Sequence, residues 1–185
     1  MLSYNDAVAG WTITIGRGWC STMEITDEPV QLASMTLAGV GARTDNQCEA
    51  GPEGCIPELW QRFMEAGLSQ LPGTQEPRYT YVLYTDYESD VNGAYTVLIG
   101  HEWEGEPPVV DKVGWTTAAL PESRYIVFKA SGGPVQQVVI EAWQYIWAWF
   151  ESSPHVRTYS GDFERYDMAG FNPEQAVVEI YLAIQ

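Results

Sequence analysis

The chain has 185 residues, of which 45% are hydrophobic, and its 25 acidic and 9 basic side chains give a formal net charge of −16. Eight tryptophans and this apolar content exclude an intrinsically disordered chain, and the apolar runs are too short and interrupted to span a membrane. Because such a negative surface repels phosphate backbones and no basic stripe compensates, we expect no direct nucleic-acid binding.

The first 27 residues look like an extension to the main domain. Trp11–Ile15 alternates apolar and polar side chains, as a short strand does, and Gly16–Gly18 ends it. This Gly-x-Gly lacks the third glycine and the following helix of a dinucleotide site, so it indicates no nucleotide cofactor. The pattern assigns no role to residues 1–27.

The first half of the main domain predicts a strand, a helix and a hairpin. Val30–Arg43 is typical of a strand that bends at its glycines. Pro57–Leu71 places its apolar side chains on one helical face, and Pro72–Gly73 ends that helix. Tyr79–Tyr87 and Ala94–Ile99 flank an Asn-Gly turn signal, so we expect them to pair as antiparallel strands.

The second half repeats this order. Trp115–Ala130 predicts a long strand kinked at Pro121, and Phe163–Tyr166 with Ala176–Ile184 predicts a second hairpin. Between them, Gly133–Phe150 predicts an aromatic helix with a proline in its first turn. Its polar residues form one narrow stripe, so the rest of its surface has to be covered. The cover is either the sheet alone or a sheet together with the wall of a ligand cavity.

Matching residues at corresponding places indicate an internal duplication. The matches are Trp60 with Trp143, Tyr84 with Tyr166, and Val97 with Glu179. We therefore expect an α+β fold in which two strand-helix-strand-strand repeats, 28–105 and 112–185, share one antiparallel sheet with both main helices packed against it. A pseudo-twofold pair of this kind leaves a central cleft, which is a usual place for a ligand.

The cysteines and histidines predict no metal site. Cys20, Cys48 and Cys55 are an odd number, which fits reduced thiols, and no signal-peptide pattern opens the chain. His101 and His155 stand apart from them and complete no zinc set. We expect a soluble, cytoplasmic protein with no metal, no cofactor and no membrane contact.

The C-terminal third carries a recognisable pattern. Gly161–Asp167 reads Gly-Asp-Phe-Glu-Arg-Tyr-Asp, follows the tryptophan-rich helix and precedes the strand Val178–Ile184. Together with the strand Tyr81–Tyr84 and the overall length, this pattern resembles the GyrI-like family, the effector-binding domains of AraC-type and MerR-type regulators. Within it, the chain looks most like the integron-associated effector-binding proteins, and the resemblance covers residues 28–185.

The resemblance implies a duplicated fold whose cleft binds lipophilic, often cationic, small molecules. It also implies an acidic residue at the base of an aromatic pocket, and the glutamate of that pattern is Glu164 here. The chain shows no helix-turn-helix segment, so the DNA-binding part of such regulators is absent from it. Relatives with this fold hydrolyse small electrophiles, bind haem or block a topoisomerase, so the fold alone does not fix the function.

Glu164 also stands out from the residues themselves, because its repeat mate is Val82. Strand alternation places Glu164 and Tyr166 on one face and Arg165 on the other. For Glu179, an ion pair with Arg165 explains the acid as well as a ligand does. The expected ligand-binding residues are Glu164, Trp143, Tyr84, Tyr166, Trp103, Trp60, Trp147 and Tyr181, and for each aromatic one a place in the plain core is the alternative.

The leading hypothesis is a small-molecule binding protein for lipophilic cationic compounds that catalyses no reaction and is linked to transcription regulation or drug sensing. The first alternative is a small-molecule hydrolase of the same fold with Glu164 as general base. The second is an acidic interaction protein whose surface mimics DNA and which binds a transcription regulator, a DNA-binding domain or a topoisomerase.

Overall fold

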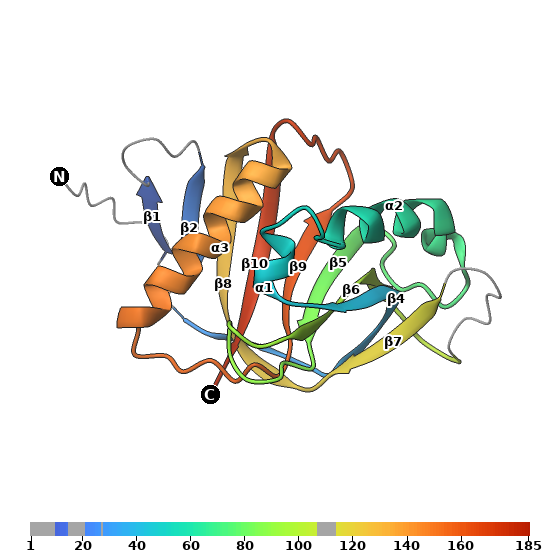
Figure 1. The fold of residues 1–185 in the computed structure, drawn as a ribbon, viewed down its shortest axis with the longest axis horizontal. Helices are drawn as coiled ribbons and strands as arrows, with labels where there is room; N and C mark the ends of the chain where they lie inside the picture. Colours follow the sequence, from blue (N-terminus) through green and yellow to red (C-terminus); the bar gives the residue numbers. More distant parts are fainter. Residues whose placement is uncertain (1–9, 15–20, 27, 107–113) are drawn as a thin grey trace.

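A computed structural model describes residues 10–14, 21–26, 28–106 and 114–185, and Figure 1 traces their path. The strands are β1 (Gly10–Thr14), β2 (Thr22–Thr26), β3 (Val30–Leu32), β4 (Met35–Thr44), β5 (Tyr79–Thr85), β6 (Tyr95–Glu102), β7 (Trp115–Leu120), β8 (Ser123–Gly133), β9 (Asp162–Asp167) and β10 (Ala176–Ile184). The helices are α1 (Asn46–Glu49), α2 (Ile56–Ala66), the short 3-10 helix Leu68–Gln70, and α3 (Val135–Ser152). These elements match the predicted order of strand, helix and hairpin in both halves.

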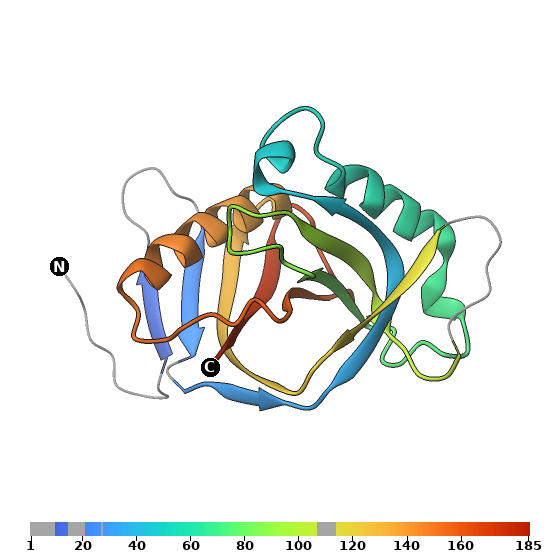
Figure 2. The same ribbon diagram turned by 60° about the horizontal axis from the view of Figure 1, so that its bottom comes forward.

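The described strands form one antiparallel sheet. Its order is β1-β2-β8-β10-β9-β5-β6-β4-β7, and β3 also pairs with β8. The part of the sheet from β8 to β7 closes on itself, because β3 pairs with β8 and β4 pairs with β7 in a single register, with Val30 opposite Tyr125 and Met35 opposite Leu120. Figure 2 shows this closure. The kink expected at Pro121 separates β7 from β8 at the point where the strand turns to follow the curve.

The internal duplication is visible in the strand order. The central run β8-β10-β9-β5-β6-β4 reads the same from both ends when β8 is matched to β4, β10 to β6, and β9 to β5. The two equivalent strands β5 and β9 pair with each other, and Val82 lies opposite its own repeat mate Glu164. The pseudo-twofold axis therefore passes between these two residues.

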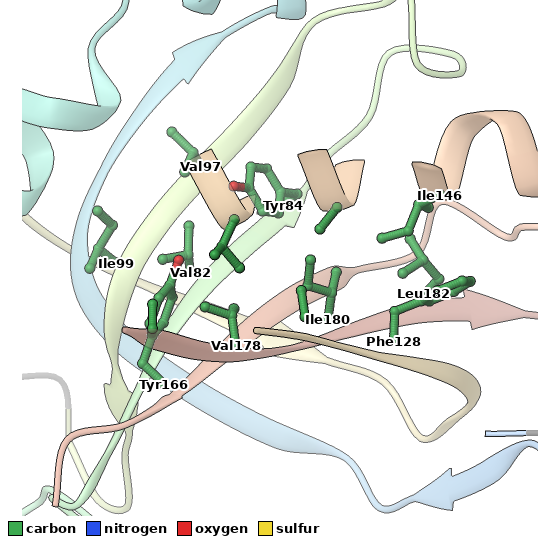
Figure 3. Packing of buried hydrophobic residues seen from close by; sticks show 14 of the residues in the cluster. Val82, Tyr84, Val97, Ile99, Phe128, Ile146, Tyr166, Val178, Ile180 and Leu182 are labelled. Carbon is green, nitrogen blue, oxygen red and sulfur yellow. The ribbon is translucent and has the colours of Figure 1, made fainter. Parts of the chain in front are cut away.

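One predicted match is wrong by a single position. In the first half, Val97 on β6 lies opposite Tyr84 on β5. Its counterpart in the second half is therefore the β10 residue opposite Tyr166, the repeat mate of Tyr84. Because Arg165 lies opposite Glu179 and the strands are antiparallel, that residue is Val178. Figure 3 shows Val97 and Val178 in the same apolar cluster, and Glu179 points to the opposite face of the sheet. The shift matters because a slip of one residue reverses the face of every side chain on a strand.

The two faces of the sheet carry two separate cores. The outer core joins the sheet to α2 and α3, and it includes Leu59, Phe63, Val138, Ala142 and Ile146 from the helices. Figure 3 shows strand residues of this cluster. The inner core is built from strand residues alone and is enclosed by the curl of the sheet; its members include Leu37, Leu83, Leu98, Leu120, Tyr125, Phe163 and Tyr181. Burial of both cores is the main stabilising contribution to the fold.

The first helix ends earlier than the sequence predicts. It was expected to continue to Leu71 and stop at Pro72–Gly73, but α2 ends at Ala66, where Gly67 adopts a left-handed conformation with φ 64°. A glycine at this position ends a helix without steric cost, and a short 3-10 turn carries the chain onward. The start of α2 is held by Glu49, whose carboxylate accepts hydrogen bonds from the backbone amides of Cys55 and Ile56.

The N-terminal extension adds two strands beyond the duplicated part. β1 pairs with β2, and β2 pairs with β8 from Thr22 to Ile25. Met23 and Ile25 are buried in the outer core, so this extension enlarges the sheet surface on which α3 packs. The predicted end of its first strand at Gly16–Gly18 lies outside the described residues. Across the part of the chain that the structure describes, no helix combines the length and apolar character needed to cross a membrane.

Candidate functional site

Glu164 lies near the middle of β9, on the face of the sheet that α2 and α3 cover, and only 1% of it is exposed. Its Oε1 accepts hydrogen bonds from the Tyr84 hydroxyl and from the Trp143 indole N–H, both at 2.7 Å. Its Oε2 accepts one from the Tyr166 hydroxyl at 2.5 Å. Two strands and one helix therefore converge on this carboxylate, as the strand alternation and the helix periodicity require.

The three donors around Glu164 are neutral. Burial raises the pKa of Glu164, and the hydrogen bonds from Tyr166, Trp143 and Tyr84 act against that rise without cancelling it. Burial also raises the pKa values of Tyr84 and Tyr166 well above the ordinary value, so both hydroxyls stay protonated. The result is a carboxyl group in an aromatic shell, without an ion-pair partner among the described residues.

The aromatic shell follows the pseudo-twofold symmetry. Tyr84 makes an edge-to-face contact with Trp143, with ring centroids 5.1 Å apart. Its repeat mate Tyr166 makes the equivalent contact with Trp60 at 5.3 Å. These two contacts confirm the predicted matches of Trp60 with Trp143 and of Tyr84 with Tyr166. Trp147 lies one helical turn beyond Trp143, with ring centroids 6.3 Å apart, and is 37% exposed, so it marks the solvent side of the shell.

The structure does not bring Trp103 to Glu164. Trp103 lies at the end of β6, where its indole N–H donates to the Glu106 carbonyl oxygen at 3.0 Å. Its ring covers Gly73 so closely that a Cβ there would lie 2.4 Å from it. This tryptophan closes the far end of the outer core and lies apart from the contacts around the carboxylate.

A correction concerns Tyr181, which lies on the other face of the sheet from Glu164. It belongs to the inner core, where its ring stacks on Phe163 at 4.5 Å. Its hydroxyl donates to Glu179, and the guanidinium of Arg165 lies over its ring. Arg165 donates from Nε to Glu179 at 2.9 Å, so the ion-pair explanation of Glu179 is confirmed.

A second buried acid near Glu164 was missed in the sequence. Asp162 is fully buried two residues before Glu164, and it is paired with Arg157. The hydroxyl of Tyr87 donates to it at 3.1 Å, and the amide of Ala183 donates to it at 2.8 Å. The period-two alternation that placed Glu164 on this face also places Asp162 there, so the signal was present. Because Asp162 is already paired with the Arg157 guanidinium, its charge is balanced within the protein, unlike that of Glu164.

The remaining polar groups among the described residues form no cluster that fits a metal ion. Within the described part of the chain, no three His, Cys, Asp or Glu side chains group closely enough to hold a metal ion. Burial and the nearby Glu49 carboxylate raise the pKa of Cys55 to about 11, and the hydrogen bond with Asp45 raises that of Cys48. Both thiols are therefore protonated at neutral pH, in a form that binds metal poorly.

Comparison with known proteins assigns the family. The model of the integron-associated effector-binding protein family matches residues 29–184. The chain belongs to this family. The match confirms the resemblance that the C-terminal pattern indicated, and it makes the duplicated part of the chain an effector-binding domain. The first two strands, β1 and β2, lie outside the matched range.

Named relatives point in the same direction. A protein of Bacillus subtilis (strain 168), YobU, is named as a candidate transcriptional regulator and is 36% identical over 150 residues, covering 80% of this chain and 91% of that protein. An integron cassette protein from the mobile metagenome of Vibrio cholerae is 30% identical with a TM-score of 0.69, covering 88% of this chain and 95% of that one. The structure of SAV2435 bound to tetraphenylphosphonium is 21% identical with a TM-score of 0.66, covering 85% and 93%.

Proposed function

We propose that this effector-binding domain binds lipophilic monocations at the aromatic shell around Glu164. The observation that carries the proposal is a fully buried carboxyl group with three neutral hydrogen-bond donors and no ion-pair partner among the described residues. Burying an acid without an ion-pair partner lowers the stability of the fold. We therefore infer that the acid kept at the pseudo-twofold axis binds a charged ligand.

The chemistry of the shell selects a delocalised cation. The ring faces of Tyr84, Tyr166, Trp143 and Trp60 offer cation–π and stacking contacts worth about 0.5–2 kcal/mol per ring when desolvated. A cation whose charge is spread over a large apolar body loses little hydration on entering such a site. The carboxylate then supplies the preference for a positive ligand over a neutral one.

Ligand entry requires the shell to open. Both oxygens of Glu164 are covered, so a cation reaches the carboxylate only if at least one of its three donors moves aside. Trp143 is the donor that comes from a helix, is half-buried and contacts the exposed Trp147. We therefore place the entrance beside α3, between Trp143 and Trp147, with the Trp143 indole moving aside during entry and donating to Glu164 again once the cation is bound.

Two relatives support this proposal. The fold neighbour SAV2435 is described as bound to tetraphenylphosphonium, a lipophilic monocation. YobU is named as a candidate transcriptional regulator. The domain then serves as the ligand sensor of a regulatory system in the cytoplasm, and a protein partner such as a transcription regulator supplies the contact with DNA.

The test uses a ligand pair matched in shape. Methyltriphenylphosphonium and triphenylphosphine oxide carry the same three phenyl rings on phosphorus and differ in charge. In a tryptophan-fluorescence titration, the wild type is expected to bind the cation at least tenfold more tightly than the neutral compound. Glu164→Gln keeps the shape and removes the charge. It should therefore weaken the affinity for the cation by about tenfold or more and leave the affinity for the neutral ligand nearly unchanged. Equal losses for both ligands would make Glu164 a structural residue.

The hydrolase alternative makes a different demand on the same residue. A general base needs a free oxygen lone pair facing a water molecule, whereas three donors occupy Glu164 in this structure. Product analysis with a small epoxide or ester in the presence of wild type and Glu164→Gln separates the two functions. Turnover that depends on Glu164 would replace the binding proposal with the enzymatic one.

A further inference from the structure

The two oxygens of Glu164 have different partners. Oε1 accepts from the Tyr84 hydroxyl and the Trp143 indole, whereas Oε2 accepts, among the described residues, from the Tyr166 hydroxyl alone, at 2.5 Å. An indole N–H can only donate, so Oε1 has to act as an acceptor. A tyrosine hydroxyl both donates and accepts, so Oε2 can carry a proton and donate it to the Tyr166 oxygen. The surroundings of Glu164 therefore accommodate its acid form without a clash between donors.

Among the described residues, no cationic side chain forms an ion pair with Glu164. The ionisable groups near it are Tyr84, Tyr87, Tyr95, Tyr166, the Asp162–Arg157 pair and His101. The tyrosines have raised pKa values and stay neutral, and Arg157 is engaged by Asp162. Burial lowers the pKa of His101, which keeps its ring neutral. A proton is then the counter-charge that a buried carboxylate takes up most readily.

We propose that the empty site holds a proton on Oε2 of Glu164 and that a bound monocation exchanges for it. This inference rests on the proposed function and adds a regulator of that site, the solution pH. The exchange balances: a carboxylic acid and a cation give a carboxylate–cation pair and one proton that passes to the solvent. The buried site is neutral in both states, so the protein never has to keep an unpaired carboxylate in its core. Burial raises the pKa of Glu164, in keeping with this exchange.

Calorimetry counts the exchanged proton. Methyltriphenylphosphonium is titrated into the protein in two buffers of equal pH and different ionisation enthalpy, at several values between about pH 5 and pH 8. The number of protons released should rise towards one per cation bound as the pH falls below the pKa of Glu164 in the empty protein. Over the same range the apparent Kd should weaken by about tenfold per pH unit. Glu164→Gln should release no proton from this site, and any cation binding that remains should be flat with pH.

A matched variant identifies the source of the proton. Glu179→Gln removes an acid of the same chemistry on the opposite face of the sheet, where it pairs with Arg165. It should release the same number of protons as the wild type. If Glu179→Gln abolishes the release and Glu164→Gln does not, the assignment to Glu164 is wrong.

A measurement without ligand keeps this inference separate from the proposed function. The side-chain carboxyl carbon of Glu164, assigned in a 13C NMR titration by its absence from Glu164→Gln, should titrate above the ordinary glutamate value of about 4.3. A midpoint at or below that value overturns the proton occupancy even if the cation binds. Cation binding without proton release over the whole pH range also overturns the exchange and leaves the binding function intact. A raised midpoint with no cation binding retains the protonated empty site but overturns both the exchange and the binding function.

Discussion

Val82 and Glu164 lie directly opposite each other on β5 and β9, at the centre of the pseudo-twofold arrangement. They are repeat mates, yet one is apolar and the other is an acid. Two carboxylates at this axis would face each other at the spacing of a cross-strand pair, where like charges repel. A single acid avoids that repulsion and still gives both halves access to it, because Tyr84 and Tyr166 come from equivalent positions and bond to the same carboxylate.

The first prediction concerns the cost of this acid. Glu164→Gln should increase the free energy of unfolding at neutral pH by about 0.5–2 kcal/mol, the gain common for a single stabilising substitution. The amide oxygen can accept from Tyr84 and Trp143, and the amide N–H can donate to Tyr166. Chemical denaturation at fixed pH measures the difference. A less stable variant would mean that hydrogen bonds to the charged form outweigh its burial.

The second prediction gives the sign of the pH dependence. Because the folded-state pKa of Glu164 is raised, its contribution to stability is complete below the ordinary value of about 4.3 and is lost as the pH rises through the folded-state pKa. The stability of the wild type relative to Glu164→Gln should therefore improve on acidification. His101 acts in the opposite sense, since its lowered pKa makes stability fall below about pH 6.5. This effect is present in both proteins and cancels in the difference between their denaturation curves.

Much of the fold could be predicted from the sequence because the same strand-helix-strand-strand pattern occurs in both halves of the chain. Hairpin signals and helix periodicity placed both repeats, and the proline at position 121 marked the bend between β7 and β8. One exception was the match of Val97, which is shifted by one residue, and another was the end of the first helix at Ala66. Similarity between two short sequence segments does not fix strand register. The register is set by pairing with the neighbouring strand, which only the tertiary structure identifies.

The candidate site was predictable in part for the same reason. Glu164, Tyr166, Tyr84 and Trp143 are neighbours because alternation and the repeat place them on one face. Tyr181 obeys alternation too, but its strand pairing turns it to the inner core, which a hydrophobic pattern alone cannot distinguish from the outer one. The ion pair of Asp162 depends on the loop that carries Arg157, and no periodicity describes a loop.

The third prediction tests whether Trp103 is structural. Gly73→Ala should destabilise the protein by about 1–3 kcal/mol, because the added methyl group has to displace the Trp103 ring, whose atoms would lie 2.4 Å away. Folded Gly73→Ala protein should still bind methyltriphenylphosphonium with the affinity of the wild type. Thermal unfolding and fluorescence titration of the same sample give both results, and a loss of affinity with unchanged stability would place Trp103 at the ligand site.

The fourth prediction uses the opposite face of the sheet as a control for charge. Glu179→Gln breaks the contact with Arg165, so it should lower the free energy of unfolding by about 0.2–1 kcal/mol, as for a partly exposed ion pair. It removes one carboxylate from the protein, as Glu164→Gln does in the cation-bound state. If the proposal is correct, Glu179→Gln should change the cation affinity at moderate salt by less than about threefold. A tenfold loss would show that overall charge, and not the placement of Glu164, draws the cation.

The last prediction compares two tryptophans that the pseudo-twofold relates. Trp143→Phe keeps an aromatic ring beside Tyr84 but removes the N–H that donates to Glu164. Trp60→Phe changes the equivalent ring beside Tyr166, and Trp60 is not one of the three donors to Glu164. A hydrogen bond to a charged group is worth about 1.5–3 kcal/mol, and it favours the ionised carboxylate that a cation needs. Trp143→Phe should therefore weaken methyltriphenylphosphonium binding by about tenfold or more and shift its pH dependence to higher pH. Trp60→Phe should change the affinity by about threefold at most and leave the pH dependence in place.

Both variants keep other tryptophans as fluorescent probes, so one titration series measures both. Equal losses in the two variants would mean that the rings act only by stacking and that the bond from Trp143 to Glu164 has no part in binding.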